Sequence, residues 1–121
     1  MKIYVAHTKS SDFKKELYEP LQEAFGDSHE LVFPHETDEG TYPSKELLKD
    51  SCDLVIAEVS DKSTSLGIEL GWANAYEIPI ICMHKIDSKP SKSLKEVSDM
   101  FIEYSNSEDL VAKLVEELKK L

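Results

Sequence analysis

One short run in the middle of the chain, Asp53-Leu-Val-Ile-Ala-Glu-Val59, restricts the possible folds more than any other feature of the sequence. It is apolar at nearly consecutive positions, whereas a strand with one exposed face alternates apolar and polar residues. Such a run is typical of a strand buried on both faces of a parallel sheet. We therefore expect residues 53–59 to form the central strand of a sheet that helices cover on both sides.

The rest of the chain alternates short apolar runs with helical patterns. Further strands are expected at residues 3–6, 31–33, 78–83 and 100–104, and helices at 13–25, 44–51, 66–77 and around 110–118. Pro20 should kink or split the first helix because proline has no N–H. Ser105 and Glu108 match a capping box at the start of the last helix.

Strands that are joined by helical crossovers pair in parallel. The predicted fold is therefore α/β: one doubly wound domain over residues 1–121, flavodoxin- or Rossmann-like, with a five-stranded parallel sheet and helices on both faces.

Charge and composition exclude several classes of partner. The 121 residues include 24 acidic and 14 basic side chains, for a net charge of −10, and all of the basic ones are lysine. A chain this acidic repels phosphodiester backbones and anionic lipid, so we expect neither a nucleic-acid polymer nor a membrane as partner. No apolar run approaches the roughly 18 residues of a membrane span, and the first residues lack the pattern of a signal peptide. A soluble, cytoplasmic protein is expected.

In doubly wound folds, ligands bind beyond the carboxyl ends of the strands. Glu69 follows the central strand, near the predicted start of a helix, where the helix dipole favours an ionised carboxylate that could act as a nucleophile. Glutamate is also common near helix starts for stability alone, so both interpretations stay open. Ser63, Ser65 and Gly67 precede it and offer hydroxyls and bare backbone to a sugar or phosphate.

Glu58 ends the central strand, where a carboxylate loses hydration unless it meets a donor or a cleft. It is either a raised-pKa acid paired with the nucleophile Glu69 or a solvated group at the end of its strand. Tyr4 lies within the first strand, where aromatic residues are usually part of the core. The histidines and acids do not have the spacing of metal ligands, so no metal site is expected.

Three segments resemble the nucleoside 2-deoxyribosyltransferase family: Ile3-Tyr4-Val5-Ala6, residues 53–59, and Ser63-Thr-Ser-Leu-Gly-Ile-Glu69-Leu-Gly-Trp-Ala73. The interval of sixteen residues from Asp53 to Glu69 is most similar to the 2'-deoxynucleoside 5'-phosphate N-hydrolase branch. The resemblance implies cleavage or transfer at the N-glycosidic bond of deoxynucleosides or their 5'-monophosphates, without a cofactor.

The resemblance also implies roles for individual residues. Glu69 would attack the anomeric carbon of the deoxyribose, Tyr4 would support it, and Ser63 would contact the sugar or its phosphate. His7, Thr8 and Ser10 stand where the hydrolases have a phosphate-binding loop that contains glycine and arginine. A neighbouring subunit completes the site in that family, which implies a homodimer or higher homo-oligomer with Ser91 or Ser93 at the interface.

The sequence departs from the family at the position where the family has its second catalytic carboxylate. Lys45 stands there, eight residues before Asp53. The general acid could then be Glu46, Asp38, Glu39 or Glu58.

Two other functions stay open. Without a proton donor a purine base leaves poorly, so Lys45 favours a non-catalytic nucleotide-binding or signalling module. An NAD-cleaving domain, which also uses a glutamate on a similar sheet, is a third possibility.

Overall fold

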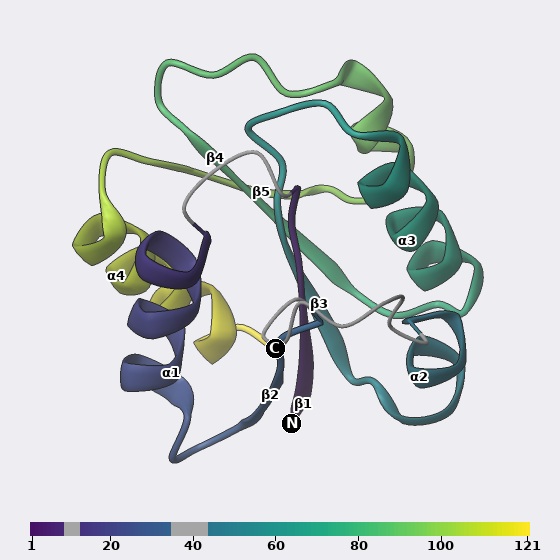
Figure 1. Cartoon of the computed structure of the whole chain (residues 1–121), viewed down its shortest axis with the longest axis horizontal. Coiled ribbons are helices and arrows are strands. Elements are labelled where there is room, and N and C mark those ends of the chain that lie inside the picture. The colour runs from purple at the N-terminus through teal and green to yellow at the C-terminus, as the bar shows by residue number, and fades with distance from the viewer. Residues whose placement is uncertain (9–12, 35–43) are drawn as a thin grey trace.

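A five-stranded parallel sheet forms the centre of the computed structural model, which describes residues 1–8, 13–34 and 44–121. The strands lie in the order β2-β1-β3-β4-β5 (Figure 1). Their bounds are β1 (Lys2–Ala6), β2 (Glu30–Val32), β3 (Leu54–Glu58), β4 (Ile80–Lys85) and β5 (Met100–Tyr104). The predicted α/β fold is thus confirmed, and the central position of β3 agrees with its continuous apolar sequence.

Helices cover both faces of this sheet (Figure 1). One face carries a π-helical turn, η1 (Lys14–Tyr18), with α1 (Glu19–Phe25) and α4 (Ser107–Lys119). The other carries α2 (Ser44–Ser51) and α3 (Thr64–Ala75). A 3-10 turn, η2 (Lys92–Glu96), lies between β4 and β5. We call the two sides of the sheet the α1/α4 face and the α2/α3 face.

Alternation along the strands separates two hydrophobic cores. Successive strand residues point to opposite faces, so every strand that is buried on both sides contributes to both cores. The core of the α1/α4 face contains Ile3, Val5, Leu54, Ile56, Ile81, Met83, Ile102 and Tyr104. The core of the α2/α3 face contains Tyr4, Ala6, Val55, Ala57, Ile80 and Cys82. The face to which each strand residue points therefore decides which candidate site residues can contact one another.

Several predicted boundaries are corrected by local hydrogen bonding. β4 begins at Ile80 rather than residue 78, because the Ile78 N–H bonds back to the helix carbonyl of Ala73. Helix α3 begins at Thr64 rather than residue 66, because Ser63 caps it. Pro20 lies in the first turn of α1, where its missing N–H costs little. The segment expected as one helix at 13–25 changes from π-helical to α-helical hydrogen bonding at Glu19, but the backbone stays helical through Tyr18 and Glu19, so the helix is not split.

The predicted capping box of the last helix is wrong. Asn106 is the N-cap of α4, and its side chain accepts a hydrogen bond of 2.9 Å from the Asp109 N–H. Ser105 instead donates its backbone N–H to the Asp109 carboxylate at 2.9 Å. Asparagine is as good an N-cap as serine, so the sequence pattern placed the cap one residue early.

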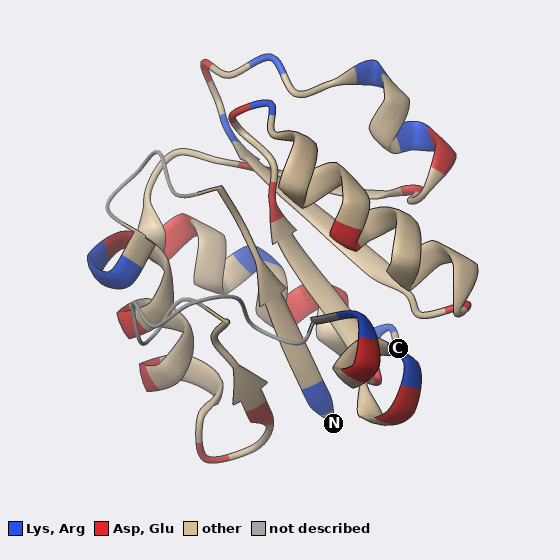
Figure 2. Cartoon of the chain, turned by 45° about the vertical axis from the view of Figure 1, so that its right-hand side comes forward, with Lys and Arg blue, Asp and Glu red and all other residues tan. Residues whose placement is uncertain are grey.

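Charged side chains are unevenly distributed over the helices. Figure 2 shows acidic positions on α1 and both acidic and basic positions on α2 and α4, whereas α3 is tan apart from one acidic position. That position is Glu69, the only charged residue in the sequence of α3.

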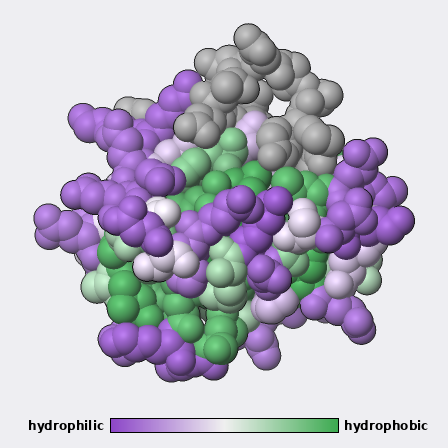
Figure 3. All heavy atoms as spheres, turned by 90° about the horizontal axis from the view of Figure 1, so that it is seen from below, coloured by the Kyte–Doolittle hydropathy of each residue, from purple (hydrophilic) through white to green (hydrophobic). Residues whose placement is uncertain are grey.

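Hydrophobic atoms are visible between hydrophilic side chains when the molecule is viewed from the end at which β1 begins (Figure 3). Among the helices in the described residues, none has the length and apolar character needed to cross a membrane.

Candidate functional site

The Glu69 carboxylate is held by a buried tyrosine of the first strand. Tyr4, only 1% exposed, donates its hydroxyl hydrogen to Oε2 of Glu69 at 2.7 Å. Glu69 itself is half-buried on α3, and Tyr4 projects from β1 toward the α2/α3 face. The structure therefore brings together the two residues that the sequence had placed 65 positions apart, and one carboxylate oxygen is fixed in direction.

Burial raises the pKa of the Glu69 carboxyl, and the hydrogen bond from Tyr4 opposes that effect. The dipole of α3, which was expected to keep this carboxylate ionised, acts only weakly at the position of Glu69. Glu69 lies in the second turn of α3, whose first turn contains no acidic residue, and the dipole effect fades within one turn. Tyr4 takes the role that we had given to the dipole, because a donor to the charged form stabilises it.

Glu58 does not lie beside Glu69. Glu58 lies two residues after Ile56 and four after Leu54 on the same strand, so its side chain points to the same face as theirs, the α1/α4 face of the sheet. Its Oε1 accepts the Ser60 N–H at 2.6 Å, and its Oε2 accepts the hydroxyl of Tyr104, a residue of the α1/α4 core. The predicted pairing of Glu58 and Glu69 as acid and nucleophile is therefore not found in the structure.

His7 and Thr8 lie with Glu58 rather than with Glu69. His7 is buried against the ring of Phe13, donates through Nδ1 to the Thr8 carbonyl at 2.6 Å and pairs through Nε2 with the Tyr18 hydroxyl. His7, Thr8 and Glu58 line a small pocket of about 10 Å³ together with Ser60, Asp61 and Lys85. A pocket of that size has room for about one water molecule. Ser10 lies outside the described residues.

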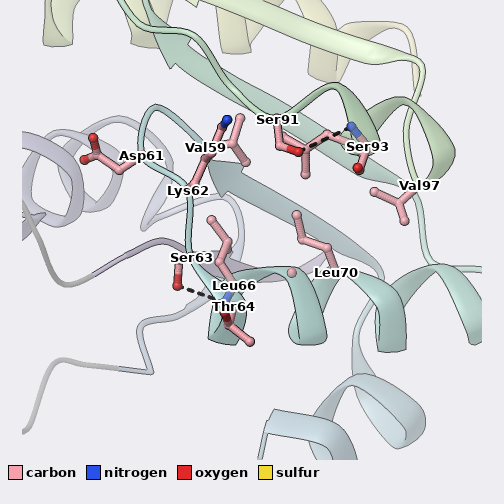
Figure 4. Close-up of a pocket in the computed structure, with 12 residues that line it drawn as sticks. Val59, Asp61, Lys62, Ser63, Thr64, Leu66, Leu70, Ser91, Ser93 and Val97 are labelled. Atoms are coloured by element: carbon pink, nitrogen blue, oxygen red, sulfur yellow. Dashed lines mark hydrogen bonds between the residues drawn. The ribbon is translucent and has the colours of Figure 1, made fainter.

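A larger cavity, of about 450 Å³, lies between α3 and η2 (Figure 4). Ser63, Gly67 and Ser93, three of the predicted binding residues, line it. Its other lining residues are mostly apolar, with further polar groups: Val59, Asp61, Lys62, Thr64, Leu66, Leu70, Ser91, Leu94 and Val97. Apolar walls with a few hydroxyls are typical of small-molecule sites.

This cavity and Glu69 lie on opposite flanks of α3. Ser63, Gly67 and Leu70 follow helical spacing on the flank that faces η2, while Glu69 reaches Tyr4 of β1. Strands β1 and β4 lie on opposite sides of β3, so the two flanks face different parts of the sheet. Ser65 is exposed and is not among the residues that line the cavity. Apart from Ser65, the predicted site residues that the structure describes thus form three groups rather than one.

Lys45 lies on the Glu69 flank of α3. Its ammonium stands 5.9 Å from the ring centroid of Trp72, which is three residues after Glu69 on the same helix. Glu46 is exposed on α2, and Asp38 and Glu39 lie outside the described residues.

Trp72 and Tyr104 were not predicted from the sequence as site residues. Helical spacing from Glu69 would have indicated Trp72, and the carboxyl end of the last strand would have indicated Tyr104.

No protein-family model matches the chain, and no curated protein matches its sequence. Solved structures are similar to it. The CMP N-glycosidase BcmB of Clostridium botulinum has a TM-score of 0.70 and 21% identity, over 94% of this chain and 98% of that one. A conserved protein from Enterococcus faecalis V583 has a TM-score of 0.65 and 18% identity, over 97% and 98%. At these identities, the likeness shows a shared fold.

Proposed function

We propose that the protein cleaves, or transfers at, the N-glycosidic bond of 2'-deoxynucleosides or their 5'-monophosphates, with Glu69 as the nucleophile. The observation that carries this proposal is the 2.7 Å hydrogen bond from the buried Tyr4 hydroxyl to the Glu69 carboxylate. A fold shared with a CMP N-glycosidase supports it. The sequence segments around Tyr4 and Glu69 support it independently, because they resemble the nucleoside 2-deoxyribosyltransferases.

The reaction follows the retaining pattern of glycoside hydrolysis. The free carboxylate oxygen of Glu69 attacks C1' of the sugar while the bond from C1' to the base nitrogen breaks. The departing base takes a proton from a general acid, and a glycosyl ester forms on Glu69. A water or a second base then attacks C1', which releases the carboxylate. Tyr4 orients the other oxygen of Glu69 and keeps the carboxyl group ionised more readily than burial alone would allow.

Three carboxyl groups remain candidates for the general acid: Glu46, Asp38 and Glu39. Helix α2, which begins just after the last two in sequence, packs against α3. The position of Lys45 over Trp72 places the start of α2 on the flank of α3 that carries Glu69. A donor on the first turn of α2, such as Glu46, would therefore approach the base from that flank.

We further propose that the protein acts as a homodimer or higher homo-oligomer through the outer surface of α3. Ile68 is 49% exposed there, beside Gly67 and Gly71. A Cβ atom at either glycine would meet nothing within 4 Å outside its own helix, so packing within this chain does not require glycine. An uncharged surface with a large apolar side chain is typical of the centre of an interface. The cavity that Ser63 and Ser93 line adjoins it.

A non-catalytic nucleotide-binding module is the second candidate. Lys45 favours it, because the chain has an ammonium group where the family has a carboxylate that serves in catalysis.

The two candidates are separated by incubating the protein with each of the four 2'-deoxynucleosides, their 5'-monophosphates, and CMP, with and without a second base. Chromatography then distinguishes free sugar or sugar phosphate, which indicates hydrolysis, from a new nucleoside, which indicates transfer. Comparison of dCMP with CMP tests whether the sugar must lack its 2'-hydroxyl. Nucleotide binding without turnover would favour the module.

A further inference from the structure

We propose that Glu58 is a positioning residue, whose carboxylate fixes the loop between β3 and α3 and so sets the place of Glu69. Its effect on catalysis rests on the function proposed above, whereas its effect on the loop does not. Glu58 is the last residue of β3 and is half-buried. Both of its carboxylate oxygens accept hydrogen bonds, one from the Ser60 backbone and one from the Tyr104 hydroxyl.

The bond to Tyr104 joins two strands that are not neighbours. Tyr104 is the last residue of β5, and β4 lies between β3 and β5 in the sheet. Tyr104 is only 7% exposed, so its hydroxyl is anchored in the core of the α1/α4 face. Burial and the adjacent Glu58 carboxylate raise the pKa of Tyr104 well above its ordinary value. Its hydroxyl therefore stays protonated and keeps donating to Glu58.

The same loop is also tied to β4. The Ser60 hydroxyl accepts the Lys85 N–H at 2.8 Å, and the Val59 N–H donates to the Met83 carbonyl at 2.8 Å. Glu58, at the end of β3, accepts the Ser60 N–H through Oε1 at an N–O distance of 2.6 Å. The first residues after β3 are thus connected to the ends of β4 and β5 as well as to β3 itself.

This loop determines where α3 begins. Ser63 caps α3 by accepting the Leu66 N–H at 3.3 Å, and the Ser63 carbonyl accepts the Gly67 N–H at 3.1 Å. Glu69 follows within two turns and meets Tyr4 on the α2/α3 face of the sheet. Because a helix moves as a unit, a displacement of its first turn is passed to Glu69. A nucleophile displaced by about 1 Å can lose about a hundredfold in rate.

The contacts of Glu58 argue against a role as general acid. Both of its oxygens already act as acceptors, and its side chain lies on the α1/α4 face, whereas Glu69 and Tyr4 meet on the α2/α3 face. The carboxylate is therefore placed to hold structure rather than to exchange a proton with a substrate at Glu69.

The experiment compares Glu58→Gln, Glu58→Ala and Tyr104→Phe in the full chain, with Glu103→Gln as the control. Glu103 is an exposed acid on β5 next to Tyr104. A glutamine can accept the Ser60 N–H through its carbonyl and donate its amide N–H to the Tyr104 oxygen. It thus preserves both links but can neither donate nor accept a catalytic proton as a carboxyl group does. The readouts are kcat and KM on dCMP and CMP, and NMR-detected hydrogen exchange of the Ser60 amide.

We expect Glu58→Gln to retain kcat within about threefold and to keep the Ser60 amide protected. Glu58→Ala should lower kcat at least tenfold with little change in KM, and should speed exchange at Ser60 at least tenfold. Tyr104→Phe should lie between the two, and Glu103→Gln should match the wild type. Should Glu58→Ala fail to fold, Glu58→Gln and Tyr104→Phe still decide the matter.

Two results would overturn the proposal. One is a loss of a hundredfold or more in Glu58→Gln with the Ser60 amide still protected, because that result would make Glu58 a proton-transfer group. The other is unchanged exchange at Ser60 in both Glu58→Ala and Tyr104→Phe, because Glu58 would then not hold the loop. The exchange measurement needs no substrate, so it tests the role in the loop even if the wild type turns over none of the nucleotides.

Discussion

The hydroxyl of Tyr4 donates to the carboxylate of Glu69 at 2.7 Å, across the space between the first strand and the third helix. Tyr4 is fully buried and Glu69 is half-buried, so the donor is rigid and the acceptor can still reach a substrate. Burial and this hydrogen bond act on the Glu69 pKa in opposite directions. The balance between them sets the pH range in which the Glu69 carboxyl group is ionised.

Replacing Tyr4 by phenylalanine should move the acid limb of the pH–rate profile to higher pH. Burial already raises the pKa of Glu69, and the variant removes the hydrogen bond that lowers it. A larger share of Glu69 is then protonated and unreactive at a given acidic pH. The plateau rate should also fall, by up to about a hundredfold, because the Glu69 carboxylate loses the hydroxyl that orients it. An acid limb that stays in place would show that Glu69 is not the titrating group.

Glu69→Gln should stabilise the folded protein at pH 7. A carboxyl whose pKa is raised in the folded state stabilises the fold only at low pH, and that contribution is lost as the pH rises through the raised value. Glutamine has no charge that loses hydration on burial, and its carbonyl oxygen can still accept the hydrogen bond from the Tyr4 hydroxyl. Thermal denaturation should show a higher Tm for the variant at pH 7, with the difference shrinking below the ordinary pKa of glutamate. An equal or lower Tm at pH 7 would contradict this prediction.

Asn106→Ala should destabilise the protein by about 1 kcal/mol, since its side chain caps α4 through the Asp109 N–H. Ser105→Ala is the matched comparison, because its hydroxyl makes only a 3.3 Å contact with the Asp109 carboxylate. It should cost less than about 0.5 kcal/mol, as is usual for surface substitutions. Urea denaturation measures the free energy of unfolding of both variants. A larger loss for Ser105→Ala than for Asn106→Ala would support the capping box predicted from the sequence.

Ile68→Glu should convert the protein from an oligomer to a monomer. The change adds a charge to the uncharged outer surface of α3, where the same charge would meet its own copy. Ile86→Glu is the control, because Ile86 is 57% exposed and lies at the end of β4, outside α3. Light scattering coupled to size-exclusion chromatography gives the masses. A wild-type protein that is already monomeric, or a variant that stays oligomeric, would exclude this interface.

The fold could be predicted from the sequence because its signals are local. The apolar run at 54–57 indicated a strand buried on both faces, and Pro20 lies just after the change from π-helical to α-helical hydrogen bonding in the first helical segment. Boundaries were less accurate where one side-chain hydrogen bond decides the end of an element. Ser63 and Asn106 are such cases, because several neighbouring residues could have served as the cap.

The site could be predicted only in part because it depends on the faces of the sheet. Alternation within β3 assigns Glu58 to the face of Ile56. The side of the sheet on which Tyr4 lies relative to Glu58 depends on the register between β1 and β3, which pairs Tyr4 with Val55. That pairing places Tyr4 on the other face, with Glu69. The bond between Glu58 and Tyr104 joins β3 to β5 across an intervening strand, and no local pattern in the sequence indicates it.

Trapping of the glycosyl ester on Glu69 tests the central claim most directly. The protein is mixed with dCMP, deoxycytidine or CMP, quenched with acid within the first turnover, and digested for mass spectrometry of the peptide that contains Glu69. We predict a mass increase on Glu69 equal to the glycosyl group, which is the free sugar or sugar phosphate less one water. We also predict loss of both the adduct and turnover, by at least about a thousandfold, in Glu69→Ala. Turnover that survives in Glu69→Ala, or an adduct on another residue, would contradict the account.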